Sequence, residues 1–199
     1  MRGGMPRLTL MTTPALLRDI KAELTTPRLQ LRVPRAGDGA IVHAAVVETL
    51  DLLRQWPASL PWAQAEPSVE VSESWCRLSA AWFMQRTTLN YLAFDTAGEL
   101  VASIGLHDID WAVPSFEIGY WGRKGYQGQG LMREAAGALV RYAFEQLGAR
   151  RVCAWVDEAN VASRRLCEAI DMQLEGILRH ERITPDGQLR NSCVYAAVV

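Results

Sequence analysis

The sequence FEIGYWGRKGYQGQGLM, residues 116–132, decides the fold of this chain. An apolar, β-prone segment runs into a glycine-rich loop, and a long helical pattern begins near Leu131. Glycine lets the backbone approach a ligand closely and adopt positive φ. A glycine loop that leads into a helix N-terminus offers unpaired N–H groups and a partial positive charge, which suit a phosphate. We therefore expect a diphosphate at this loop, with the acid–base chemistry on the strand before it.

The bulk composition describes an ordinary globular protein. The 199 residues suit one large domain, or one domain with a short extension, and 49% hydrophobic residues are enough for a sizeable core. A net charge of −1 gives no reason to expect nucleic acid or a membrane surface as partner. Residues 1–11 lack the apolar core of a signal peptide, and no apolar run has the length of a membrane span. We expect a cytoplasmic protein.

The cysteines and histidines show no metal-ligand spacing. They are Cys76, Cys153, Cys167, Cys193, His43, His107 and His180. Scattered cysteines in a cytosolic protein are typical of reduced thiols. Histidines without a spaced ligand pattern do not predict a zinc site, so no metal is expected.

Periodicity on both sides of the opening stretch predicts a single α/β domain. Helices are expected over residues 14–24, 40–49, 68–85, 128–147 and 160–169, and strands over residues 28–33, 89–94, 100–109, 115–121, 151–156, 172–181 and 188–198. Three successive strands joined by tight turns predict an antiparallel meander, and the following strand–helix–strand order predicts a right-handed crossover. The expected domain covers residues 25–199, after an N-terminal extension with a short helix, residues 1–24.

The segment WPASLPWA, residues 56–63, is expected to be a loop of fixed shape, because its prolines exclude a regular helix. Two interpretations stay open for its large aromatic faces. Trp56 and Trp62 either pin the loop to the core or form a wall of the cleft that binds the acceptor substrate.

Two motifs resemble the GCN5-related N-acetyltransferase (GNAT) family. Residues 127–132, QGQGLM, resemble its Q/R-x-x-G-x-G/A acyl-CoA loop, and residues 160–166, NVASRRL, resemble its second signature. Residues 60–62 (LPW), 117–120 (EIGY) and 174–176 (LEG) are similar to the RimJ/RimL-like subgroup, which acetylates the N-termini of ribosomal proteins. The resemblance covers roughly residues 24–199.

The resemblance implies a GNAT fold, in which a mixed, mostly antiparallel central sheet flanked by helices is splayed around an acyl-CoA site. It also implies acetyl-CoA as cosubstrate, no metal, an amine acceptor that is a protein N-terminus or a small molecule, and a homodimer as one arrangement. The residues implied in cofactor binding are Ile118, Gly119, Tyr120, Gln127, Gly128, Gln129, Gly130, Leu131, Met132, Asn160 and Ser163.

The chemistry of acetyl transfer selects the candidate catalytic residues. A protein α-amine has a pKa of about 8, against about 10.4 for lysine, so a modest base can deprotonate it. Glu117 and Glu181 are the candidate bases, and His180 is a weaker third. Ser163 is the candidate donor of a hydrogen bond to the leaving thiolate. Each of the two residues on this helix also has a purely structural interpretation. The Ser163 hydroxyl could bond back to the backbone of its own helix. Asn160 could cap the helix, a role that is compatible with cofactor binding.

The sequence departs from the family pattern at two places that bear on function. Met132 replaces the last glycine or alanine of the loop, and Cys167 stands where many members carry a tyrosine acid. The leading hypothesis is acetyl transfer to a protein or peptide α-amine. A second is acetylation of a small amine such as a polyamine, aminoglycoside or amino-acid analogue. A third, motivated by Cys167, is a non-catalytic acyl-CoA-binding module.

Overall fold

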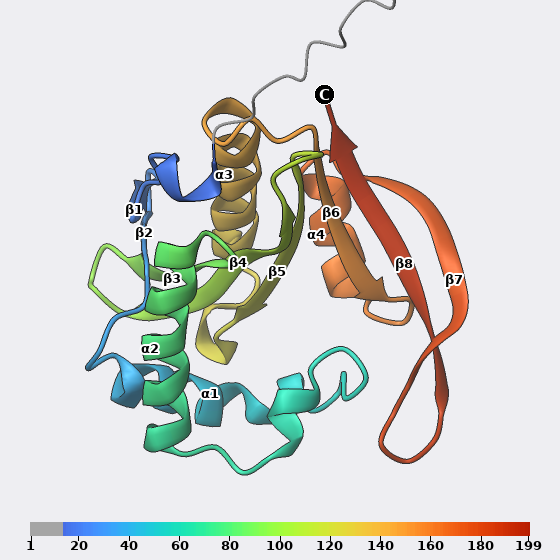
Figure 1. The fold of residues 1–199 in the computed structure, drawn as a ribbon. Coiled ribbons are helices and arrows are strands. Elements are labelled where there is room, and N and C mark those ends of the chain that lie inside the picture. Colours follow the sequence, from blue (N-terminus) through green and yellow to red (C-terminus); the bar gives the residue numbers. More distant parts are fainter. Residues whose placement is uncertain (1–13) are drawn as a thin grey trace, which may run out of the picture.

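A computed structural model describes residues 14–199 and shows one eight-stranded sheet with helices on both faces (Figure 1). The strands are β1 (Glu23–Thr25), β2 (Leu29–Arg32), β3 (Leu89–Asp95), β4 (Leu100–Asp110), β5 (Ser115–Gly122), β6 (Arg151–Asp157), β7 (Gln173–Ile183) and β8 (Leu189–Val198). The helices are α1 (Gly39–Leu53), α2 (Val69–Gln85), α3 (Leu131–Glu145) and α4 (Val161–Ala169), with 3₁₀ turns η1 (Ala15–Leu17), η2 (Pro61–Gln64) and η3 (Lys124–Tyr126). Among these helices, none is both long and apolar enough to cross a membrane.

The sheet is antiparallel except at its centre. Its strand order is β1-β2-β3-β4-β5-β6-β8-β7, and β5 pairs with β6 in parallel. A parallel pair needs a crossover connection, which α3 provides between the two strands. The predicted meander, now β3–β4–β5, and the predicted strand–helix–strand unit, β5–α3–β6, are both confirmed.

Strand β3 separates two hydrophobic cores, because successive residues of a strand point to opposite faces. Leu89 and Tyr91 belong to the core that contains the buried face of α3. Leu92 and Phe94 belong to the other core, which contains residues of α1 and α2. The pair α1 and α2 therefore covers one face of the sheet, and α3 covers the opposite face (Figure 1).

The helix predicted over residues 14–24 is wrong. The structure has only η1 there, followed by extended chain and by β1, which pairs with β2. Two apolar residues of the predicted stripe, Leu16 and Leu17, are 67% and 72% exposed. The other two, Ile20 and Leu24, pack against the core without a helix, so a helix here would have little packing to stabilise it, and β1 pairs with β2 instead.

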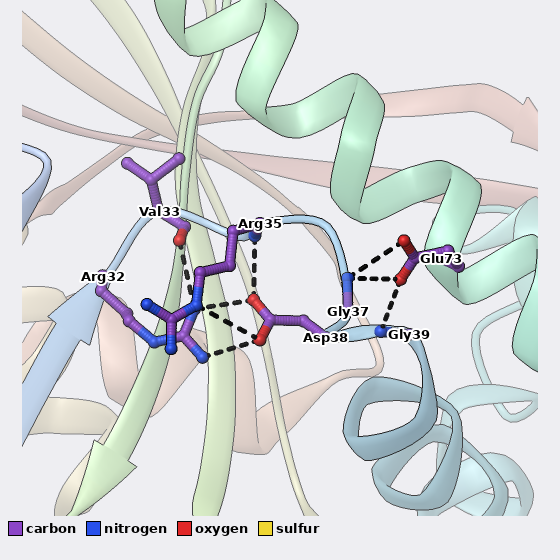
Figure 2. A network of polar contacts seen from close by, with 7 residues as sticks. All are labelled: Arg32, Val33, Arg35, Gly37, Asp38, Gly39 and Glu73. Carbon is purple, nitrogen blue, oxygen red and sulfur yellow. Dashed lines mark hydrogen bonds and ion pairs between the residues drawn. The ribbon is translucent and has the colours of Figure 1, made fainter.

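The start of α1 is held by a polar network that reaches α2 (Figure 2). Asp38 occupies the N-cap position of α1, but its carboxylate binds Arg32 through two hydrogen bonds, of 2.6 and 2.8 Å, instead of capping the helix. Glu73 of α2 accepts the backbone N–H groups of Gly37 and Gly39 in its place. A Cβ at residue 39 would lie 2.6–2.8 Å from Glu73, so glycine there permits the contact between the two helices.

Candidate active site

The centre of the sheet opens because β5 and β6 part after a short paired stretch. Their register runs from Ser115–Arg151 to Glu117–Cys153. Beyond it, β5 stays paired with β4 as far as Gly122, and β6 stays paired with β8 as far as Asp157. The facing edges of β5 and β6 therefore diverge, which is the splay that the family resemblance implies.

A cleft of about 740 Å³ lies at this opening. Its lining comes from α1, α2 and the segment between them that includes η2, from strands β4, β5 and β6, and from the start of α4, with one residue each from β3 and β7. Six of the residues predicted for the site line it, namely Glu117, Ile118, Gly119, Tyr120, Asn160 and Ser163. The segment with Trp56 and Trp62 also lines it, which favours the cleft-wall interpretation of that loop.

Glu117 lies in the cleft beside a histidine and an aspartate of β4. The Nε2 atom of His107 is 3.9 Å from Oε1 of Glu117, and its Nδ1 atom is 3.1 Å from Oδ2 of Asp108. Asp108 has φ of 46° at an irregularity in the β4–β5 register. A Cβ at Gly119 would be 2.7 Å from His107 Nε2, so glycine leaves the room for this imidazole.

The environment of Glu117 favours its neutral form. Burial raises the pKa of its carboxyl above the ordinary value, and the nearby charge of Asp108 adds to the rise. The charges of His107 and Arg182 act in the opposite direction, but burial dominates. A carboxylate whose pKa is raised is a better general base, so the geometry suits proton abstraction.

Ser163 lies at the other side of the cleft, in the first turn of α4. Its backbone N–H donates to Oδ1 of Asn160 at 3.1 Å, so Asn160 is an N-cap, as one of the two interpretations had it. Its hydroxyl is 2.9 Å from the phenol oxygen of Tyr120, which is also 3.4 Å from Sγ of Cys167. Burial raises the pKa of the Tyr120 phenol, so it remains a proton donor at neutral pH.

The glycine loop joins β5 to α3 on the exposed surface. Residues 127–130 are all exposed, and Gly128 and Gly130 have φ of 73° and 74°. These left-handed residues delay α3 to Leu131, three residues after the predicted start at 128. The amide of Glu134 is the first to donate a hydrogen bond along the helix, to the carbonyl of Gly130. Because Gly130 is the N-cap and has no side chain, it cannot cap the amides of the first turn.

Arg28 and Met132 help to fix this loop. Arg28 donates to the carbonyl of Gln129 at 2.9 Å and binds the Glu134 carboxylate at 2.6 Å. The Met132 side chain lies over β5, since its Cε would be 3.5 Å from a Cβ at Gly122. Met132 therefore packs against the strand where a glycine or alanine would leave space.

The charged residues of the loop are already paired. Arg123 binds Glu48 at 2.7 Å and Lys124 binds Asp51 at 2.6 Å, both on α1. The amide of Gln127 donates to the carbonyl of Lys124 within η3. The loop's capacity to bind an anion thus rests on the amides from Gly128 onward rather than on these side chains.

Glu181 lies outside the cleft lining. Its carboxylate accepts the Ser192 hydroxyl at 2.6 Å and Arg182 Nε at 3.2 Å. His180 has φ of 55° at an irregularity between β7 and β8, and it shares a separate hollow with Glu181. Of the three candidate bases, only Glu117 lines the cleft. Arg182 of β7, which is bound by Glu181, also lines it.

Sequence reasoning missed several side chains of the site. His107, Asp108 and Arg182 come from strands whose register a sequence does not show. The contact of the Tyr120 hydroxyl with Ser163 was also not expected. The alternation of residues along β5 places Tyr120 and Glu117 on opposite faces, which could have indicated a separate role for the phenol.

Residues 28–173 match the family model described as the acetyltransferase (GNAT) domain. The chain belongs to the GNAT family. Among relatives, the "Putative ribosomal N-acetyltransferase YdaF" of Bacillus subtilis (strain 168) is 38% identical over 82 residues, which are 41% of this chain and 45% of YdaF. The N-acetyltransferase YoaA of the same organism is 29% identical over 132 residues, 66% of this chain and 74% of YoaA. The chain thus spans about half the length of YdaF.

Solved structures show the same GNAT fold. The ribosomal L7/L12 alpha-N-protein acetyltransferase RimL, in complex with coenzyme A, superposes with a TM-score of 0.80 at 22% identity, covering 87% of this chain and 96% of RimL. The microcin C7 self immunity acetyltransferase MccE, in complex with acetyl-CoA and AMP, gives 0.78 at 18% identity, covering 87% and 94%. The predicted family and fold class are confirmed.

Proposed function

We propose that this GNAT protein transfers an acetyl group from acetyl-CoA to the α-amine of a protein or peptide. The observation that carries the proposal is the cleft between β5 and β6, which brings a partly buried glutamate and a serine hydroxyl to one cavity. Acetyl-CoA supplies an activated acyl group on a thioester. The remaining tasks fall to residues of the chain.

Three features of the chain fit acetyl-CoA. The amides that follow Gly128 start α3 without a cap, and they suit a diphosphate. The edge of β5 from Ile118 to Tyr120 is free of β6, so its backbone can pair with an extended amide chain. The hydroxyl of Ser163 lies in the same cleft, within reach of a group held along that edge.

In the proposed reaction, Glu117 accepts a proton from the α-ammonium group. The neutral nitrogen then attacks the thioester carbon, so that an N–C bond forms and the C–S bond breaks. The proton that the nitrogen must still lose to become an amide passes to the thiolate, which leaves as the thiol of coenzyme A. The hydroxyl of Ser163 donates a hydrogen bond to the departing thiolate, and the phenol of Tyr120 can donate to Ser163 in turn. Because a thiol has a pKa of about 8.5, hydrogen bonding is enough and no strong acid is required.

Glu117 is favoured over Glu181 as the base in this proposal. Glu117 is partly buried in the cleft, whereas Glu181 is an exposed residue outside the cleft lining, and its carboxylate is held by Ser192 and Arg182. The role that fits Glu181 is to hold Arg182 at the rim of the cleft. Comparing Glu117→Gln with Glu181→Gln separates the two assignments.

A thiol-release assay with acetyl-CoA tests the proposed function. We expect turnover with peptides that have a free α-amine and no turnover with the same peptides blocked at the N-terminus. Isothermal titration with coenzyme A serves as the control for folding and cofactor binding. Coenzyme A binding without turnover on any amine would contradict the proposal and favour a non-catalytic module, while turnover on small amines alone would favour the small-molecule alternative.

A further inference from the structure

Five of the seven tryptophans of the chain line the cleft. They are Trp56, Trp62, Trp75, Trp121 and Trp155. They come from the segment between α1 and α2, from α2, and from β5 and β6, so elements far apart in the sequence build one aromatic lining. Trp75 and Trp121 also pack against the core under α1 and α2, and the aromatic surface that remains toward the cleft points to an apolar ligand group.

The wall made by Trp62 is open to a ligand. Trp62 is 47% exposed, and the centroid of its ring lies 6.4 Å from that of Trp121, with an angle of 49° between the ring planes. Exposed indole surface gains stability when an apolar group covers it. The wall is also held in place, because Arg54 donates to the carbonyl of Ala63 at 3.0 Å.

The pairing of the charged side chains in the cleft indicates where the ammonium group of a substrate would bind. Glu66, Asp157 and Arg182 line the cleft, and each is paired with an opposite charge, on Arg54, Arg190 and Glu181 respectively. Asp108 and Glu117, in contrast, share a single histidine, His107. Among the described residues, surplus negative charge in the cleft is therefore confined to one point, beside Glu117.

We infer that the acceptor carries a large apolar or aromatic side chain next to its α-amine. This rests on the proposed function. The ammonium group faces Asp108 and Glu117, and the side chain of the first residue lies against Trp56, Trp62 and Trp121. A polycation would have only one negatively charged partner in the cleft, with its other charges next to apolar surface. A small first side chain would leave the indoles exposed to water.

A set of matched peptides tests the inference. The peptides differ only in the first residue, which is phenylalanine, leucine, serine, alanine or arginine, and kcat/KM is measured with acetyl-CoA. Burial of a large apolar side chain corresponds to roughly 10- to 100-fold in binding. We expect phenylalanine and leucine to exceed serine, alanine and arginine by about 10-fold or more.

Two variants locate the preference in the cleft. In Trp62→Ala, the ratio of kcat/KM for the phenylalanine peptide to that for the serine peptide falls at least about fivefold. Trp82→Ala is the matched control, since Trp82 lies on α2 but does not line the cleft, and it leaves the ratio unchanged. Thermal melting of both variants verifies that they are folded.

The possible outcomes separate a failure of the inference from a failure of the proposed function. Serine or alanine peptides used as well as the phenylalanine peptide would overturn the inference while the proposed α-amine acetylation stands. An unchanged ratio in folded Trp62→Ala would also overturn it, since the wall would not set the preference. Turnover on small amines but on none of the peptides would overturn the proposed function, and the inference with it.

Discussion

At the scale of single residues, Glu117 shows a conflict between stability and chemistry. Its carboxyl is partly buried, and the nearest opposite charge is His107, whose Nε2 atom lies 3.9 Å from Oε1 of Glu117. This distance is too long for a hydrogen bond that would compensate a buried charge. A buried group whose pKa is raised destabilises the folded state whenever it is ionised. Such a cost is common at catalytic positions, where the group's reactivity is retained at the expense of stability.

We expect Glu117→Gln to lower kcat/KM by about 100-fold or more and to raise the stability of the protein at neutral pH. Because the folded pKa is raised, ionised Glu117 costs stability only above the pH at which glutamate ionises in the unfolded chain. The gain in melting temperature should therefore be present at pH 7 and vanish in acid. Thermal melting across pH measures it. A loss of stability at pH 7 would show that the charge is compensated.

The neighbours of Glu117 should move its titration in opposite directions. The charge of His107 lowers the pKa of Glu117, and the charge of Asp108 raises it. Activity requires the ionised base, so the acid limb of the kcat/KM profile should shift to higher pH in His107→Gln and to lower pH in Asp108→Asn. Three other titratable or charged groups act on this region, namely Arg182 and Glu181 on β7 and Cys153 on β6. They are unchanged in both variants. Shifts of the same sign would contradict the arrangement.

The sequence could identify only part of this site. Glu117, Gly119 and Ser163 stand inside recognisable motifs, and all three line the cleft. His107 carries no motif, because its contact with Glu117 depends on the β4–β5 register and on the missing side chain of Gly119. Long-range register is set by packing and not by local sequence.

At the scale of elements, the network around Asp38 fixes the position of α1, which lines the cleft (Figure 2). Burial pushes the pKa of Asp38 upward, but the hydrogen bonds and charge of Arg32 outweigh it, so its pKa is lower than the ordinary 3.8. The pair stabilises fully above that value, and its contribution is lost as pH falls through the lower folded pKa.

Removal of Asp38 should destabilise the fold. In Asp38→Ala the Arg32 guanidinium, whose side chain is 14% exposed, loses its partner, and we expect a loss of about 3 kcal/mol in urea unfolding. Arg35→Ala is the control within the same network. Its side chain is 72% exposed and 4.0 Å from Asp38, so about 0.5 kcal/mol or less is expected. Equal effects of both changes would contradict a buried role for the Arg32 pair.

The glycine loop gives a second test at this scale. Alanine at Gly128 or Gly130 must adopt φ near +73°, which costs about 1–2 kcal/mol and shifts the amides. We expect each variant to weaken coenzyme A binding by about 10-fold in isothermal titration. Gly137→Ala, inside α3, meets only ordinary contacts from 3.5 Å outward and should bind normally. Normal binding by the loop variants would show that the diphosphate lies elsewhere.

Element prediction succeeded where local pattern and tertiary packing agree. The strands of the meander alternate between two cores, and their turns carry clear signals, so each predicted range differs from the structure by one residue. The helix prediction for the N-terminal segment failed because Leu16 and Leu17 stay exposed, while Ile20 and Leu24 reach the core without a helix. The start of α3 moved because two left-handed glycines precede it.

At the scale of the whole molecule, sequence order predicted the parallel strand pair and its crossover helix but not the shape of the cleft. The parallel pair and the crossover follow from strand–helix–strand order. The tryptophan lining does not, since it depends on where α1, α2 and their connecting segment lie against β5 and β6. An aromatic-rich loop indicates a surface of some kind, and only the tertiary structure shows what it faces.

The short contact between β5 and β6 also bears on the order in which the chain folds. The β3–β4–β5 meander and the β7–β8 hairpin join neighbours in sequence, whereas Glu117 meets Cys153 across the whole of α3. Local contacts form with less loss of chain entropy than distant ones. In pulse-labelled hydrogen exchange we expect amides of β3 and β4 to gain protection before those of β6, whose earlier or simultaneous protection would contradict this order. The line along which the cosubstrate is proposed to bind would then be the last part of the sheet to assemble.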